Sequence, residues 1–344
     1  MEDMMIVAGP CSAESRAQVV ETAQAVALAG ATLFRAGVWK PRTKPGGFEG
    51  LGEKALPWLI EAQELSGIPS ATEVATGWHL KTAIEAGLRW LWIGARTATN
   101  PFAMQELADE IASLPADIRN QLNIMVKNPV NPDLELWIGA LQRVQQAGAG
   151  RVIAVHRGFS SYGSKLYRNE PRWAIPIELK RRMPDITILS DPSHIGGRRQ
   201  LIAPLARQAA DIGFDGLMIE THPSPDNALS DADQQITPPQ LAEILSTLTP
   251  KRDEGCGENL DELRRRIDYI DDELIDLLAK RMEVSREIGR YKRQHGMPVV
   301  QPERYNLLMQ KRVEEASALG ITPVFTRQLL ALIHEESVKQ QIQP

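Results

Sequence analysis

Eight short apolar segments recur through the first two-thirds of the chain, and polar residues of the kinds used in catalysis stand at or just past their ends. The segments cover residues 4–9, 32–37, 69–74, 90–95, 123–128, 151–156, 187–192 and 216–221. Segments with a helical pattern separate them and close on glycine, such as 15–29 before Gly30 and 198–212 before Gly213. Apolar strands that alternate with helices indicate parallel strands covered by helices. Eight such units predict an α/β fold, a closed (β/α)8 TIM barrel.

The chain has 344 residues, which exceeds one barrel of about 250 residues, so a second domain is expected. We predict a barrel over 1–248, a linker rich in charge and glycine over 249–257, and a helical domain over 258–344. No Gly-x-Gly-x-x-Gly follows the first strand, which argues against a dinucleotide-binding fold.

Charge and cysteine content restrict the partners and the compartment. A net charge of −5 argues against nucleic acid or an anionic membrane as a partner. No apolar run approaches the roughly 20 residues of a membrane span, and no signal-peptide pattern is present. Cys11 falls in the predicted barrel and Cys256 outside it, in the predicted linker, so we expect no disulfide between them and a cytoplasmic protein.

The C-terminal segment has apolar residues at helical spacing from residue 259 to about residue 294. They are Leu260, Leu263, Ile267, Ile270, Leu274, Leu277 and Leu278. A helix of about 35 residues is about 52 Å long, more than the remaining chain can cover, so a partner chain is expected. Pro302 and Pro323 mark the starts of two further helices. We therefore predict a three-helix all-α domain that forms a homodimer, with a larger oligomer left open.

Four possible metal ligands are predicted at or just beyond strand ends: Cys11, His194, Glu220 and Asp231. Taken singly, Cys11 is more often a small buried residue, and His194 is as often structural as ligating. Active sites of such barrels lie where the strands end, so the four would share one rim. A thiolate, an imidazole and two carboxylates suit Mn²⁺, Fe²⁺, Co²⁺ or Zn²⁺ better than Mg²⁺.

Basic residues follow the same strand ends: Arg35, Lys40, Arg42, Lys44, Arg96, Lys127, Arg157 and Arg198. Any one of them could be a solvated loop charge. Eight on one face of a net-acidic chain favour a pocket for two phosphates, or for a phosphate and a carboxylate.

Seven segments together resemble 3-deoxy-D-arabino-heptulosonate-7-phosphate (DAHP) synthase, in its short type I form related to 3-deoxy-octulosonate-8-phosphate synthase. They are Gly9-Pro-Cys-Ser-Ala-Glu14, Lys40-Pro-Arg-Thr43, Gly94-Ala-Arg96, Val126-Lys-Asn128, His156-Arg-Gly158, Asp191-Pro-Ser-His194 and Ile219-Glu-Thr-His222. The resemblance covers about residues 4–248. The octulosonate enzyme usually carries an Ala-Asn-Arg-type sequence in place of Lys40-Pro-Arg-Thr43.

This resemblance implies condensation of phosphoenolpyruvate with erythrose 4-phosphate. The substrate-binding residues would be Arg35, Lys40, Pro41, Arg42, Thr43, Arg96, Lys127, Arg157 and Asp191, with residues 40–43 on the aldose. The metal would polarise the aldehyde. Lys40 would donate the proton and Glu73 would help to place the attacking water. The alternative is an octulosonate synthase that uses arabinose 5-phosphate.

Residues 258–343 resemble the all-α chorismate mutases, which are intertwined dimers that convert chorismate to prephenate. The segments are Leu263-Arg264, Leu278-Ala-Lys-Arg281, Gly289-Arg-Tyr-Lys292, Pro302-Glu-Arg304 and Ile333-His-Glu-Glu-Ser-Val-Lys-Gln-Gln341. By resemblance, Arg264 of the partner subunit and Arg281 would bind carboxylates. Lys292 and Gln341 would act on the ether oxygen, and Arg304 and Ser337 would complete the pocket.

One departure concerns the residue after Arg304, which is usually glutamate in the family and is Tyr305 here. It keeps open a second interpretation, in which the helical domain is a dimerisation or ligand-sensing module with little mutase activity. The first interpretation predicts a bifunctional enzyme that acts at the entry to the shikimate pathway and at its branch to phenylalanine and tyrosine. The fusion suggests feedback on the barrel by chorismate or prephenate.

Overall fold

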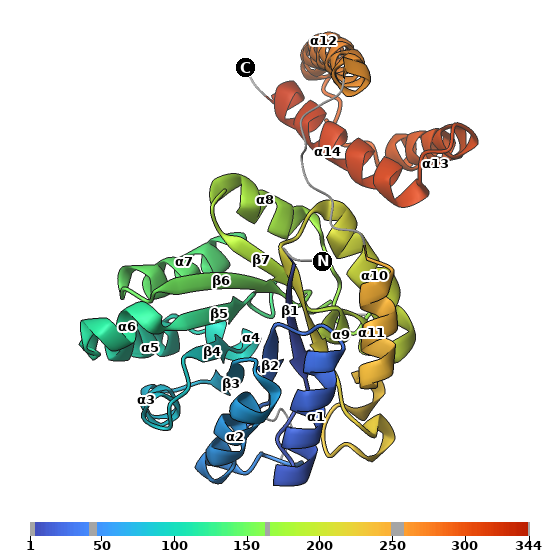
Figure 1. Cartoon of the computed structure of the whole chain (residues 1–344). Coiled ribbons are helices and arrows are strands. Elements are labelled where there is room, and N and C mark those ends of the chain that lie inside the picture. Colours follow the sequence, from blue (N-terminus) through green and yellow to red (C-terminus); the bar gives the residue numbers. More distant parts are fainter. Residues whose placement is uncertain (1–3, 41–46, 162–165, 249–257, 343–344) are drawn as a thin grey trace. The chain divides into compact units, whose positions relative to one another are not determined.

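The computed structural model describes residues 4–40, 47–161, 166–248 and 258–342, and it divides into two compact units, Met1–Arg252 and Asp253–Pro344. Within the described residues of the first unit, eight parallel strands close into a barrel in sequence order (Figure 1). The predicted barrel is therefore confirmed. The predicted linker, 249–257, lies outside the described residues.

The strands are short and buried. They are β1 (Met5–Gly9), β2 (Leu33–Arg35), β3 (Ser70–Val74), β4 (Trp90–Ile93), β5 (Asn123–Lys127), β6 (Arg151–His156), β7 (Thr187–Ser190) and β8 (Gly216–Glu220). Strand β1 closes the barrel by pairing with β8, from Met5 opposite Gly216 to Gly9 opposite Glu220. A Cβ atom on Gly9 would lie 2.1 Å from the Arg35 carbonyl oxygen, so only glycine fits there.

Helices follow the strands: most cover the outer face of the barrel, and the short α4 and α9 stand directly after the ends of β4 and β7. They are α1 (Arg16–Leu28), α2 (Leu56–Ser66), α3 (Gly77–Glu85), α4 (Ala95–Ala98), α5 (Pro101–Ser113), α6 (Ala116–Gln121), α7 (Leu134–Gln146), α8 (Ala174–Arg182), α9 (Pro192–Gly196), α10 (Arg199–Ile212) and α11 (Pro238–Ser246). Short 3-10 turns are η1 (Gly52–Ala55), η2 (Pro225–Asn227) and η3 (Ala232–Gln234). The expected left-handed caps are present, for example Gly67 after α2 and Gly213 after α10.

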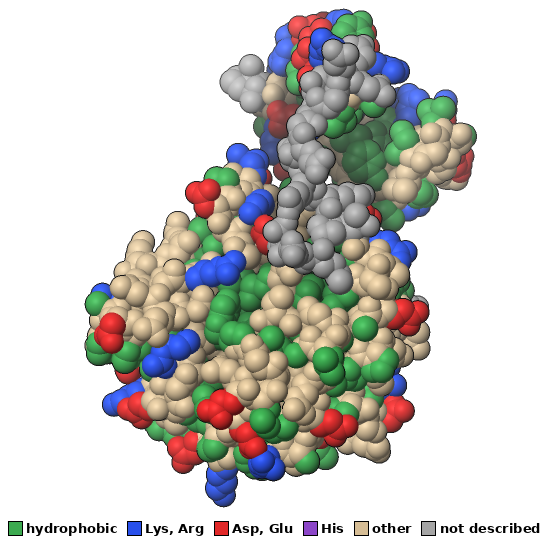
Figure 2. All heavy atoms as spheres, in the orientation of Figure 1, with side chains coloured by type: hydrophobic (Ala, Val, Ile, Leu, Met, Phe, Trp, Pro, Cys, Tyr) green, Lys and Arg blue, Asp and Glu red, His purple; other side chains and the backbone are tan. Residues whose placement is uncertain are grey.

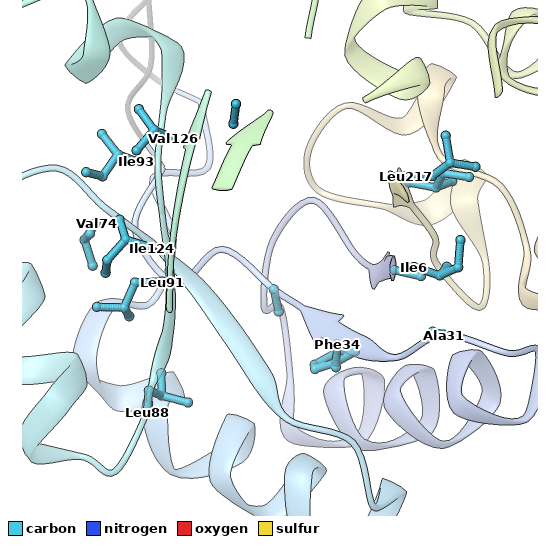
Figure 3. Close-up of a cluster of buried hydrophobic side chains, with 14 of the residues drawn as sticks. Ile6, Ala31, Phe34, Val74, Leu88, Leu91, Ile93, Ile124, Val126 and Leu217 are labelled. Atoms are coloured by element: carbon cyan, nitrogen blue, oxygen red, sulfur yellow. The ribbon is translucent and has the colours of Figure 1, made fainter. Parts of the chain in front are cut away.

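The core has two layers because side chains alternate along each strand. Ile6 and Leu91 point outward to the helices, among the apolar side chains drawn in Figure 3. Val7 and Trp92, one position further along, fill the barrel interior instead. Burial of one such aliphatic side chain stabilises the fold by about 1.5–3 kcal/mol. The packed interior makes the barrel a rigid support for the residues at its rim.

The second unit contains α12 (Glu258–Gln294), α13 (Pro302–Ala318) and α14 (Pro323–Ile342) among its described residues, as predicted. Helix α14 packs against both α12 and α13. The apolar stripe of α12 stays open to solvent: Ile267 is 58% exposed and Leu274 is 53% exposed. Figure 2 shows hydrophobic side chains at the surface of this unit, among charged ones. A search of the described residues finds no helix that could cross a membrane.

Candidate active site at the strand ends

A pocket of about 350 Å³ opens where the strands of the barrel end. Among the described residues, basic side chains from successive loops line it: Lys40, Arg96, Lys127, Arg157 and Arg168. Glu73, His194 and Asp231 add acidic groups and an imidazole. Parallel strands bring these residues together because all their C-terminal ends meet at one rim.

The predicted metal ligands form one cluster beside this pocket. One ligand atom each from Cys11, Glu220 and Asp231 lies within 4.8 Å of the other two. The His194 Nε2 atom is 3.7 Å from Glu220 Oε1, and its Nδ1 atom is 2.7 Å from Asp191 Oδ2. A carboxylate on Nδ1 directs Nε2 toward a metal, as in many metal sites. The donor set therefore fits a divalent transition-metal ion.

Cys11 is a fully buried free thiol. Burial, followed by the charge of Glu220, raises the pKa of this thiol to about 12, although the Lys40 ammonium acts in the opposite direction. The Lys40 Nζ atom is 2.9 Å from Cys11 Sγ. A thiol must lose its proton to bind a metal, so cation uptake at this cluster is coupled to proton release.

Asp231 has a left-handed backbone with φ of +47°, which is uncommon for a residue with a side chain. Its Oδ1 atom is 3.1 Å from Arg168 Nη1, and its Oδ2 atom accepts from Cys11 Sγ at 3.3 Å. Burial opposes ionisation of Asp231, but the nearby guanidinium of Arg168 holds its pKa well below the usual range. Asp231 is therefore an anion at neutral pH.

The predicted cations Lys127 and Arg157 line the pocket and have defined partners. The Lys127 Nζ atom is 2.8 Å from Asp191 Oδ2, and both side chains are buried. Arg157 donates from Nη1 to Asn169 Oδ1 at 2.7 Å. Burial lowers the pKa of Arg157 to about 10, so this guanidinium remains protonated at neutral pH. The pocket is thus suited to an anion with several negative oxygens.

Two predicted substrate-binding residues lie beneath the pocket rather than in its lining. Arg35 is 1% exposed, donates to Glu220 Oε1 at 3.1 Å, and places its guanidinium carbon 4.7 Å from the ring centroid of Trp92. Asp191 is fully buried between Lys127 and His194. Both therefore contact residues of the pocket or of the donor cluster without lining the pocket themselves.

Of the other predicted site residues, one lines the pocket, one does not, and four lie outside the described residues. Glu73 lines the pocket and accepts from Trp92 Nε1 at 3.1 Å. A Cβ atom on Gly94 would lie 2.2 Å from Glu73 Oε1, so a larger residue there would require the Glu73 carboxylate to move. Arg198 is exposed at the start of α10 and is not among the lining residues. Pro41, Arg42, Thr43 and Lys44 lie outside the described residues.

Sequence reasoning missed Arg168 and Asn169, which line the pocket from the loop between β6 and α8. It also missed Gln234, a buried residue that contacts both Arg168 and Glu220. These residues do not end a strand, so the strand-end pattern gave no signal for them. The unusual length of the β6–α8 connection was the available hint.

In the helical unit, α12 and α14 bring several predicted residues together. Arg281 donates from Nη1 to Ser337 Oγ, and burial lowers the pKa of Arg281. Gln341 is buried, and its Oε1 atom has no hydrogen-bond partner among the described residues. Lys292 donates to the Val299 carbonyl at 2.7 Å. The result is one cationic face with an available acceptor.

Four further residues of the helical unit are placed differently. The rings of Tyr305 and His334 lie 4.4 Å apart between α13 and α14. Burial lowers the pKa of His334, and the charges of Arg281 and Lys292 act in the same direction. Arg264 and Arg304 are exposed. Arg264 precedes Arg281 on one helix by about 25 Å, so it cannot reach this face within its own chain.

A parallel barrel with an anion pocket and a donor cluster at its strand ends defines a TIM-barrel enzyme. Residues 2–254 match the model of the DAHP synthetase I family, and residues 263–342 match that of chorismate mutase type II. The chain therefore belongs to the DAHP synthetase I family and carries a C-terminal domain of the chorismate mutase type. The resemblances stated from the sequence are confirmed at this level.

Individual relatives agree with this assignment. The chain is 34% identical over 232 residues to a phospho-2-dehydro-3-deoxyheptonate aldolase from Thermotoga maritima, covering 67% of this chain and 64% of the relative. It is 27% identical to a 2-dehydro-3-deoxyphosphooctonate aldolase from Rhodopseudomonas palustris, covering 74% of this chain and 91% of that protein. The crystal structure of the Thermotoga maritima DAHP synthase superposes with a TM-score of 0.63 at 31% identity, covering 71% of this chain and 68% of that one. The chain thus spans somewhat less than two-thirds of the Thermotoga protein's sequence.

Proposed function

We propose that the barrel condenses phosphoenolpyruvate with erythrose 4-phosphate, giving DAHP and phosphate. The observation that carries this proposal is the pocket in which five basic side chains, among them the buried Lys127, lie beside a thiol–imidazole–carboxylate cluster. Residues 1–248 would form this enzyme, 249–257 a linker, and 258–344 the second domain. A reducing, cytoplasmic location suits the buried free thiol of Cys11.

The cations would hold phosphoenolpyruvate by its phosphate and carboxylate. Arg96, Lys127 and Arg157 line the pocket from consecutive strand ends, so each can reach a different face of a small dianion. Arg35 and Asp191 would keep Glu220 and Lys127 in place from below. Holding the substrate in this way aligns its C3 carbon with the aldehyde.

A divalent ion such as Mn²⁺, Fe²⁺, Co²⁺ or Zn²⁺ would be held by Cys11, His194, Glu220 and Asp231. When bound, it supplies a Lewis acid that polarises the aldehyde oxygen. C3 of phosphoenolpyruvate attacks the aldehyde carbon, and water then adds at C2 before phosphate leaves.

Lys40 and Glu73 are proposed for the proton transfers. Burial opposes the charge on Lys40, but the neighbouring groups, with Cys11 first, raise its pKa above the ordinary value, so it is an ammonium. Lys40 can therefore give a proton to the new alkoxide oxygen. Glu73 lines the same pocket and can orient the attacking water.

The rival for the barrel is the octulosonate synthase that uses arabinose 5-phosphate, and the Rhodopseudomonas relatives are named 2-dehydro-3-deoxyphosphooctonate aldolases. The test measures phosphate release from phosphoenolpyruvate with each aldose under the same conditions. A higher kcat/KM with erythrose 4-phosphate supports the proposal. A higher value with arabinose 5-phosphate overturns it. If EDTA leaves the rate unchanged in both the natural protein and Cys11→Ala, the metal part fails.

We propose that the helical unit rearranges chorismate to prephenate in a site shared by two chains. Arg281, Ser337, Lys292 and Gln341 would bind the folded dicarboxylate and its ether oxygen. Arg264 of the partner subunit would complete the site, with Arg304, because Arg264 is too far along α12 to serve its own chain. The exposed apolar stripe of α12 supports a homodimer.

Tyr305 and His334 favour testing the sensing alternative as well. Loss of chorismate absorbance measures turnover in the intact protein, and calorimetry measures chorismate binding. Saturable turnover that Arg281→Ala abolishes supports a mutase, whereas binding without turnover supports a sensor. Feedback is tested by adding prephenate to the condensation assay. An unchanged rate at saturating prephenate refutes feedback by that compound.

A further inference from the structure

Gln234 lies at the end of η3, between the donor cluster and the anion pocket, and is 1% exposed. Its Nε2 atom donates to Glu220 Oε2 at 2.6 Å. Its Oε1 atom accepts from Arg168 Nη1. One buried amide therefore joins a carboxylate of the cluster to a guanidinium of the pocket.

The chemistry of the two partners fixes the orientation of this amide. A guanidinium only donates and a carboxylate only accepts, so the amide oxygen must face Arg168 and the NH₂ group must face Glu220. Both bonds involve a charged partner, which makes them stronger than bonds between neutral groups. The backbone N–H of Gln234 also donates to the backbone carbonyl of Asp231 at 3.2 Å, which ties the main chain of Gln234 to that of a neighbouring residue of the cluster.

The two carboxylate oxygens of Glu220 have different neighbours, and only one of them contacts Gln234. Oε1 accepts from Arg35 at 3.1 Å and lies 3.7 Å from His194 Nε2. Oε2 accepts from Gln234. The side chain of Glu220 is thus held at both oxygens, and the loss of one bond allows the carboxylate to rotate.

We propose that Gln234 is a positioning residue that couples the cation site to the anion site. It sets the Glu220 carboxylate toward a divalent cation and the Arg168 guanidinium toward an anionic substrate at the same time. The inference rests on the cation and anion sites proposed above for the barrel. Because coupling between two ligands is reciprocal, the cation should strengthen anion binding by the same factor as the anion strengthens cation binding.

The test uses the full-length protein with Co²⁺ and phosphoenolpyruvate as probes and no aldose, so that no turnover occurs. Gln234→Met has a similar length and neither polar bond, and Gln234→Asn keeps an amide that is too short to reach both partners. Asp233→Asn changes the exposed preceding residue and is the matched control. Calorimetry gives both dissociation constants, and the visible spectrum of bound Co²⁺ reports its ligand geometry.

We expect Gln234→Met and Gln234→Asn to weaken Co²⁺ binding about 10- to 100-fold and to alter the Co²⁺ spectrum. They should also weaken phosphoenolpyruvate binding and bring close to one the factor by which each ligand strengthens binding of the other. The control Asp233→Asn should leave Co²⁺ binding, phosphoenolpyruvate binding and this factor unchanged. Tryptophan fluorescence checks that each variant is folded. If Gln234→Met is not folded, the Gln234→Asn variant provides the test.

Three results would overturn the inference or its basis. A folded Gln234 variant that binds Co²⁺ within threefold of the natural protein, with the same spectrum, excludes the positioning role. Weaker Co²⁺ binding with unchanged phosphoenolpyruvate binding excludes the coupling. A natural protein that binds neither probe refutes the proposed function instead, which separates the two failures.

Discussion

Replacing Asp191 by asparagine removes a negative charge that lies between Lys127 and His194 in the interior. The Asp191 and Lys127 atoms are 2.8 Å apart, and their side chains are 0% and 6% exposed. At an effective dielectric constant of 20, their attraction is about 6 kcal/mol, part of which offsets desolvation. Removing one partner of such a pair costs about 3–5 kcal/mol. We expect Asp191→Asn to lower the free energy of unfolding of the barrel by that amount.

The assay is urea unfolding at pH 7 followed by tryptophan fluorescence, because all seven tryptophans belong to the barrel unit. Lys127→Met should cost a similar amount. In the double variant Asp191→Asn/Lys127→Met, neither charge is left without its partner. Its loss in unfolding free energy should therefore be smaller than the sum of the two single losses by at least about 2 kcal/mol. A loss under about 1 kcal/mol for Asp191→Asn, or additivity within about 0.5 kcal/mol, would refute the reasoning.

A matched control separates the charge from helix capping. Asp191 also accepts from the His194 backbone at the start of α9, at 3.0 Å. The exposed Asp133 accepts from the Leu136 backbone at 2.9 Å and caps α7 in the same way. Asparagine caps about as well as aspartate, so Asp133→Asn should change the unfolding free energy by less than about 0.5 kcal/mol.

Three further predictions follow from single residues. Burial lowers the pKa of His156 to about 3, so below about pH 6.5 the unfolded chain takes up a proton that the folded chain does not. The free energy of unfolding therefore falls with falling pH, by up to about 1.4 kcal/mol per pH unit. Urea unfolding at pH 7 and pH 5 should show a smaller decrease of this free energy for His156→Gln than for the natural protein. An equal decrease in both proteins contradicts this prediction. Co²⁺ binding should release a proton from Cys11, which calorimetry in buffers of different ionisation enthalpy measures. The Cys11→Ala variant should release one proton fewer than the natural protein. Equal proton release from both proteins contradicts a thiolate ligand. Gly94→Ala should displace Glu73 and lower condensation activity in a folded protein, whereas Gly139→Ala, where the new Cβ would meet only a flexible arginine side chain, should not. Full activity of Gly94→Ala would exclude the need for glycine there.

The strand-end residues could be predicted because strand position and rim position are the same property in a parallel barrel. Lys127 and Glu220 end β5 and β8, and both lie at the rim. Arg35 ends β2 in the same way, yet its guanidinium contacts Glu220 and Trp92 and is not part of the pocket lining. Leu33 faces the barrel interior, so Arg35, two positions further on, faces it as Lys127 and Glu220 do. The contacts of Arg35 with Glu220 and Trp92 depend on side chains of other strands, which the sequence of β2 alone does not specify.

Other parts of the site depend on contacts between distant loops. Arg168 and Gln234 meet across 66 positions of sequence, and neither carries a local pattern that marks it. The long helix α12 was predictable from its period, which depends on neighbouring residues alone. The period does not identify a surface that could cover the apolar stripe, because such a surface would come from groups far along the chain or from another chain.

The open apolar stripe of α12, if the proposed homodimer forms over it, links the helical unit to protein concentration. If a second chain covers it, mass action sets the fraction of complete mutase sites, and dilution removes them while each barrel keeps its own pocket. The ratio of the two activities then depends on how much of the protein the cell contains. Changes in expression level would alter the balance between the two reactions without a change in any residue.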